Sequence, residues 1–272
     1  MKKIGLLFTI HAVILLCCVK PLSFYRYSPA DTLERAYKKN DLKRLHKFFE
    51  QWRGELRPFS EIESTALSDT TQKLVDLFAA FYQPFQLSNY NSDLDDTFYK
   101  GIQYAVVQNT LTYSFIDSID MKSEIIPPKR YFYWTYPSRP LKRKISPFRP
   151  DLNLEGIEIL YLSKFYLDII LEFLGENNFI PPMPDESDTN YEKEKEYRKK
   201  RQFLNNYIKI TTAHMGGGSN LLTFPVASRI YFTKDLKQAV ISYQVGLGSG
   251  RAYFKLKEDT WQLIGANIFM YE

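Results

Sequence analysis

The chain has 272 residues, of which 44% are hydrophobic and 25% charged, a balance that excludes wholesale disorder. Its length suits one large domain or two small ones. The formal net charge of +5 falls by two, to about +3, once the N-terminal Lys2 and Lys3 are removed with a signal, which is too little to favour a nucleic-acid partner.

The N-terminus has the pattern of a secretory signal. A short positive region precedes an apolar run over residues 4–16, which is short for a membrane span. The chain's two cysteines, Cys17 and Cys18, follow directly. Residues 15–18, Leu-Leu-Cys-Cys, resemble the lipobox of bacterial lipoproteins, although Gly, Ala or Ser usually precedes the modified cysteine. We expect export with a lipid on Cys18 (or Cys17); an ordinary cleaved signal or an uncleaved anchor is the alternative.

The sequence predicts four segments: a signal peptide over 1–17, a tether over 18–29, a helical part over 30–86 and an α+β part over 98–272. The last two are expected to form one globular unit. Because no cysteine follows Cys18, the exported unit has to be held together by its core alone, which its length permits.

Helical spacing of apolar residues begins at Ala30. It is interrupted at residues 39–41, which predicts two short helices packed as a hairpin. His46 lies in the second helix, and we expect it to be a half-exposed helix residue. A third helix is predicted from an N-cap at Ser68 to a stop at Pro84. The acidic residues at 93–96 lack the spacing of a calcium loop, so a solvated loop is favoured.

From Phe98 onward apolar residues alternate, as in strands. Residues 102–107 and 111–115 are predicted to form two strands that turn near Gln108. Residues 131–136, YFYWTY, are a further strand candidate, confined by flanking prolines to an edge or a short run.

The densest basic cluster lies between Pro137 and Pro150. It consists of Arg139, Lys142, Arg143, Lys144 and Arg149. Such a cluster suits an anionic glycan, a lipid headgroup or a phosphate. The alternative, a solvated loop with proline stops, is favoured because nothing Gly-rich or helical frames the charges.

A strand over 157–162 and a helix from Ser163 to a stop at Gly175 are predicted next, and the helix is apolar on nearly every side, as in a core. Residues 177–189 are expected to form a surface loop. A highly charged helix over 191–210 follows, with Phe203, Leu204, Tyr207 and Ile208 turned inward.

His214 precedes a run of three glycines, which include Gly216 and Gly217, between a helix and a sheet. Glycines let the backbone approach a ligand, and His214 could then act as a general acid or base. Structural hydrogen bonding is the favoured alternative. After the signal, His46 and His214 are the remaining histidines, so a three-histidine metal site is excluded. No phosphate-binding, dinucleotide-binding or hydrolase motif is present, so no metal and no cofactor are expected.

Four strand-like runs close the chain, at 226–232, 238–245, 251–257 and 261–271, and predict an antiparallel meander. Gly246-x-Gly248-x-Gly250 precedes a strand rather than a helix, so we interpret it as a hairpin loop. The apolar face of this sheet has to be buried, and the helix over 163–174 is predicted to pack against it. The fold class is therefore α+β, with N-terminal helices and a largely antiparallel sheet.

Several segments resemble uncharacterised envelope lipoproteins of Bacteroidetes-type bacteria. They are YKGIQYAVVQNTLTYSF, FRPDL, ILYLSKFY, RQFLNNYIKI, HMGG, LLTFP and AVISYQV…RAYFKLKEDTWQLI, together with the signal that ends in cysteine. The resemblance covers most of the chain after the signal and implies no activity. The closing strands are similar in outline to cone-shaped α+β folds of the NTF2 or cystatin kind, by analogy only.

These patterns lead to three hypotheses for an exported protein of the cell envelope, at the outer membrane or facing the periplasm. The first is a non-enzymatic, membrane-anchored module that binds an envelope protein or an anionic glycan. The second is a hydrolase or transferase that acts on envelope polymers through His214. The third is a structural accessory subunit.

Overall fold

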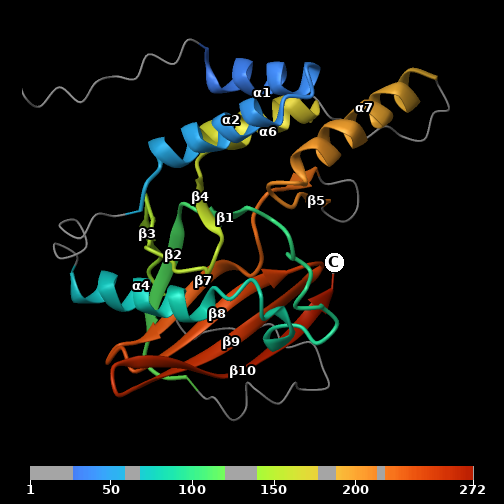
Figure 1. The fold of residues 1–272 in the computed structure, drawn as a ribbon. Helices are drawn as coiled ribbons and strands as arrows, with labels where there is room; N and C mark the ends of the chain where they lie inside the picture. Colours follow the sequence, from blue (N-terminus) through green and yellow to red (C-terminus); the bar gives the residue numbers. More distant parts are fainter. Residues whose placement is uncertain (1–26, 59–67, 120–139, 177–187, 213–217, 272) are drawn as a thin grey trace, which may run out of the picture.

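The computed structural model describes residues 27–58, 68–119, 140–176, 188–212 and 218–271. A six-stranded sheet carries helix α4 across one face, and the remaining helices form a second layer beyond a small two-stranded sheet (Figure 1). The α+β class is confirmed. The predicted signal, the strand candidate at 131–136 and most of the tether predicted at 18–29 and of the loop predicted at 177–189 lie outside the described residues.

The first two helices form the predicted hairpin. Helix α1 spans Pro29–Lys38 and helix α2 spans Leu42–Glu55. Ser28 caps the first, because its hydroxyl accepts from the Asp31 amide, and Asp41 caps the second in the same way. No helix among the described residues is long and apolar enough to cross a membrane.

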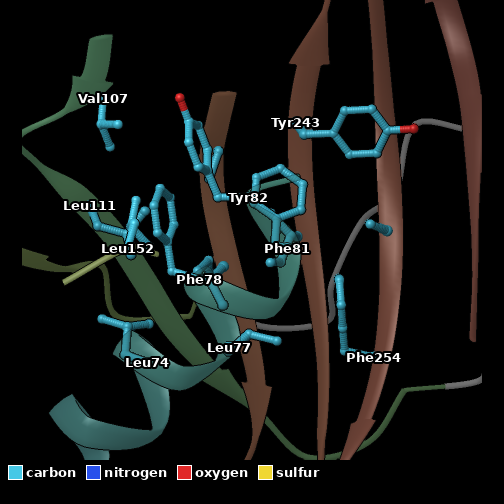
Figure 2. Close-up of a cluster of buried hydrophobic side chains, with 14 of the residues drawn as sticks. Leu74, Leu77, Phe78, Phe81, Tyr82, Val107, Leu111, Leu152, Tyr243 and Phe254 are labelled. Carbon is cyan, nitrogen blue, oxygen red and sulfur yellow. The ribbon is translucent and has the colours of Figure 1, made fainter. Parts of the chain in front are cut away.

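Helix α4 spans Asp69–Phe81 and begins at the predicted cap, Ser68. A short 3-10 helix, η2, follows at Leu87–Asn89. In Figure 2 the side chain of Phe81 points from α4 toward Tyr243 and Phe254 of the sheet, and Phe78 lies beside Phe81 on the same helix. All four side chains are buried, which places the larger core between α4 and the six-stranded sheet.

The four closing strands form the predicted meander. They are β7 (Val226–Thr233), β8 (Gln238–Val245), β9 (Gly248–Lys257) and β10 (Thr260–Tyr271), each antiparallel to the next. The interpretation of the glycine triplet as a loop is wrong in part. Gly246, with a φ of +58°, lies in the turn, whereas Gly248 and Gly250 lie inside β9 and pair with β8.

The two strands predicted to pair near Gln108 belong to different sheets. Strand β1 (Tyr104–Gln108) pairs in parallel with β4 (Glu158–Leu162), whereas β2 (Leu111–Ile116) lies in the six-stranded sheet. Its neighbours there are β7, which is parallel, and the short β3 (Arg143–Ile145), which is antiparallel.

Bonds from two other segments explain why β1 does not fold back on β2. The Val106 amide donates to the Thr223 hydroxyl at 2.9 Å, and the Thr223 amide donates to the Val106 carbonyl at 2.8 Å. The Gln108 side chain bonds to both the amide and the carbonyl of Ala227. Thr223 therefore satisfies the backbone amide and carbonyl of Val106 that a hairpin would have used, and Gln108 ties the end of β1 to β7.

Helix α6 (Lys164–Leu174) begins at Ser163 and ends at Gly175, as predicted. It does not cover the meander. It packs with α1, α2 and α7 (Asp188–Leu204) in a second core, where Tyr166 stacks on Trp52 at 4.8 Å between ring centroids.

The four inward residues predicted for the charged helix at 191–210 are buried in this second core, although α7 ends at Leu204. Two short strands, β5 (Thr211–Thr212) and β6 (Ser219–Asn220), follow.

Candidate functional site

Most of the residues proposed from sequence as a site lie outside the described residues. These are His214, Gly216, Gly217, Arg139 and the two cysteines. Three basic residues of the candidate site, Lys142, Arg143 and Lys144, do have a described place in the fold. We call these three residues the basic edge.

The basic edge lies at one end of the six-stranded sheet rather than in a loop. Arg143 and Lys144 belong to β3, the terminal strand, and pair with Tyr113 and Thr112 of β2. The prediction of a solvated loop is therefore wrong for residues 143–145. Ile145 explains the difference, because it packs against the larger core and so holds β3 on β2.

All three side chains of the basic edge are exposed. The Arg143 guanidinium lies 5.0 Å from the centroid of the Phe115 ring, a cation–π contact that orients it. Successive strand residues point to opposite faces, so Arg143 and Lys144 present their charges on the two sides of the sheet. Within the described ranges, no carboxylate forms an ion pair with any of the three.

A second polar group, which we call the Tyr104 cluster, joins α2 to the two-stranded sheet. Tyr104 is buried, and its hydroxyl donates to Glu50 Oε1 at 3.1 Å. The Tyr104 hydroxyl oxygen also lies 3.2 Å from His46 Nδ1. Arg53 continues the cluster, 3.3 Å from Glu50 and also paired with Glu158 of β4.

The hydrogen bonds of the Tyr104 cluster place a proton on one nitrogen of His46. A tyrosine that donates its one proton to Glu50 accepts from His46, so the His46 Nδ1 is the donor of that bond. Burial, followed by the bond to Glu50, raises the pKa of Tyr104 well above its usual value. Tyr104 is therefore a neutral donor at physiological pH, and the cluster links α2 to β1 and β4.

A third polar group anchors the described end of the glycine-rich segment. The Glu176 carboxylate accepts from both the amide and the hydroxyl of Ser219, each at 2.6 Å. The Tyr197 hydroxyl lies 2.9 Å from the Ser219 hydroxyl. A Cβ at Gly218 would collide with Glu176 Oε2, so a side chain at this position would displace that carboxylate. Glu176 therefore fixes the backbone where the segment enters β6.

None of these groups is a metal site. Among the residues that the structure describes, no three histidine, cysteine, aspartate or glutamate side chains are grouped to hold an ion. Comparison with protein-family models, curated proteins and solved structures finds no match to this chain. The resemblance to envelope lipoproteins therefore stays a prediction.

The sequence reasoning missed the Tyr104 cluster. His46, Glu50 and Arg53 are spaced by four and three residues, which places them on one side of α2. That spacing was a usable signal. Tyr104 and Glu158 come from strands more than 50 residues away in the chain, and their pairing with α2 depends on the parallel β1–β4 sheet that alternation alone does not predict.

Proposed function

We propose that the protein is an exported, lipid-anchored protein of the cell envelope, and that it acts as a non-enzymatic binding module. Its basic edge takes an anionic envelope component, such as an acidic glycan or a phosphate-bearing headgroup. One observation supports this most strongly. Three consecutive exposed cations, two of them on the terminal strand β3 and Lys142 directly before it, have no ion-pair partner in the described parts of the chain.

The surrounding sequence reinforces the charge of this edge. From Ile125 to Pro150 the chain contains basic residues but no aspartate or glutamate. A binding strand that is already hydrogen-bonded to β2 loses less conformational freedom on binding than a loop does. Anionic groups carried along a polymer could therefore meet cations on both sides of a rigid edge.

Neutralising the basic edge tests the proposal. We expect Lys142→Gln, Arg143→Gln and Lys144→Gln together to reduce retention of the full-length chain, in mild detergent, on an immobilised acidic polysaccharide. The matched control is Lys193→Gln, Lys195→Gln and Lys199→Gln on α7, which removes the same charge from exposed positions. This control has the same net charge as the triple variant at 142–144, but its basic edge is intact. It should therefore bind like the wild type.

Vesicles separate the two sources of anionic groups. Retention by the polysaccharide but not by vesicles of anionic phospholipid indicates a glycan ligand, and the reverse indicates a headgroup. Equal losses in the two triple variants would show that only net charge matters, and the basic edge would then have no specific role.

The alternative function is a hydrolase or transferase on envelope polymers that uses His214. The observation that favours it is the anchored end of the glycine-rich segment, where a carboxylate and a tyrosine meet at Ser219. A His214→Gln variant should then lose turnover of envelope polymer while its thermal unfolding is unchanged. If the wild-type chain releases no product from isolated envelope polymers, this alternative is wrong.

A further inference from the structure

The hairpin of α1 and α2 has a basic surface of its own. Five exposed cations lie close together in the chain, and we call them the hairpin patch: Arg35, Lys38, Lys39, Lys43 and Lys47. The one acidic residue between them is Asp41, which is paired with Arg44. Within the described ranges, no carboxylate forms an ion pair with Arg35, Lys39 or Lys43. The hairpin therefore presents positive charge that these ion pairs do not neutralise.

Two cations of the hairpin patch stand where they weaken α2. Lys43 lies in the first turn of this helix, which contains no acidic residue, although the positive end of the helix dipole favours anions there. Lys47 follows four residues later on the same side of α2, and like charges at that spacing repel each other. Departures from such local rules are expected at functional sites. The two lysines therefore indicate a contact outside the helix.

Apolar groups accompany the cations. Leu42, at the tip of the hairpin, is 48% exposed, and its backbone is held because the Tyr207 hydroxyl donates to the Leu42 carbonyl at 3.2 Å. Tyr27, at the start of α1, is 40% exposed, and the Arg35 guanidinium lies 3.9 Å from its ring centroid. Cations mixed with leucine and tyrosine suit the headgroup region of a bilayer, where the cations meet phosphates and the apolar groups enter the acyl boundary.

The chain before the hairpin is short. Residues 19–26 separate Cys18 from Tyr27, and this stretch spans at most about 30 Å when fully extended. A lipid on Cys18 would therefore keep the hairpin close to the bilayer surface, at a high effective concentration. A basic patch beside a lipid anchor acts as a second membrane signal, because anionic lipids attract it and strengthen a reversible attachment.

We propose that the hairpin patch lies on the anionic headgroups of the membrane that holds the lipid anchor, with Leu42 at the headgroup boundary. The inference rests on the lipid anchor of the proposed function. It also selects between the two ligands proposed for the basic edge. With the helical layer against the bilayer, the basic edge belongs to the other layer, the six-stranded sheet, and so meets an acidic glycan rather than a headgroup (Figure 1).

Acylation of lysines by a water-soluble reagent tests this orientation. The full-length chain, purified from cells, is added to preformed vesicles of phosphatidylcholine with or without phosphatidylglycerol. We expect Lys39 and Lys43 to react several-fold more slowly on the anionic vesicles, because headgroups cover them. Lys255 and Lys257, which are exposed on β9, should react equally on both. Mass spectrometry reads the acylated lysines and the lipid on the same protein.

A pair of matched variants tests whether the patch acts as a unit. Lys39→Gln with Lys43→Gln should remove the difference between the two kinds of vesicle at Lys38 and Lys47. Lys255→Gln with Lys257→Gln removes the same charge from the other layer and should keep that difference.

The outcomes separate the patch from the anchor. Equal rates at Lys39 and Lys43 on the two kinds of vesicle would overturn the proposal, even if the lipid is present on Cys18. Slower reaction at Lys142 and Lys144 instead would place the basic edge on the membrane and would overturn it as well. A chain that carries no lipid but still shows slower reaction at Lys39 and Lys43 would contradict the anchor and support the patch.

Discussion

Gly250 shows how closely single residues fit between the outer strands. A Cβ at this position would lie 2.6 Å from the Tyr243 ring and would collide with the Asn267 carbonyl. The ring cannot move away easily, because Tyr243 is buried and its hydroxyl donates to the Tyr90 carbonyl at 2.7 Å. The glycine is therefore required by close approach of side chain and backbone within a strand.

Two glycine substitutions are predicted to have opposite effects on the free energy of unfolding. Gly250→Ala should lower it by about 1–3 kcal/mol, because the added methyl overpacks a fixed site. Gly54→Ala, in α2 with no atom near the added Cβ, should raise it by about 0.5–1 kcal/mol, because alanine loses less backbone entropy in a helix. Urea unfolding of both variants measures the difference. A Gly250→Ala variant as stable as the wild type would contradict the packing described here.

Residue patterns identified parts of the candidate site but not their arrangement. The basic cluster could be seen as a run of charges, and the helix caps Ser68 and Ser163 were predicted correctly. The Tyr104 cluster was not predicted, because its members meet only when α2 packs on the two-stranded sheet. Local spacing reports which side of a helix a residue occupies, but not which strand lies opposite.

At the scale of elements, the strands with simple alternation were predicted well. Ala239, Ile241 and Tyr243 share one buried face of β8 with Ala252 and Phe254 of β9, as expected. Turn residues between these strands made the order of pairing clear. The meander could therefore be predicted from the sequence because each strand pairs with its neighbour in the chain.

Two contacts between elements were predicted wrongly, for a shared reason. Helix α6 is nearly apolar all round, which predicts burial but does not identify the surface that buries it. The core on the sheet is filled by α4, whose Leu74, Leu77 and Phe78 form one buried side. Likewise the first four residues of β1 are all buried, so its pattern could not reveal that it leaves β2 for a parallel partner.

At the scale of the whole molecule, two cores stand on either side of the small β1–β4 sheet. The described N-terminal helices belong to the second core, at the top of Figure 1. The basic edge belongs to the six-stranded sheet, below that core in the same view. The N-terminal helices and the basic edge therefore belong to different layers of the fold.

Variants of the two cysteines test the proposed lipid anchor at this scale. Cys18→Ser should release the protein from the membrane fraction, because the lipid on that side chain would be its attachment. Cys17→Ser is the matched control and should stay membrane-bound. Fractionation of cells that express each variant gives the answer, and membrane association that survives loss of Cys18 would exclude this residue as the anchor.

The binding affinity of the basic edge for an acidic polysaccharide, measured as salt is raised, tests the central claim most directly. Each cation near an anionic surface contributes about 1 kcal/mol at low salt, so the triple glutamine variant at 142–144 should bind about 100-fold more weakly than the wild type. Its affinity should also depend less on salt, since fewer ions are released on binding. The α7 triple variant should follow the wild-type curve. If the curves of all three proteins coincide, the basic edge is not the binding surface.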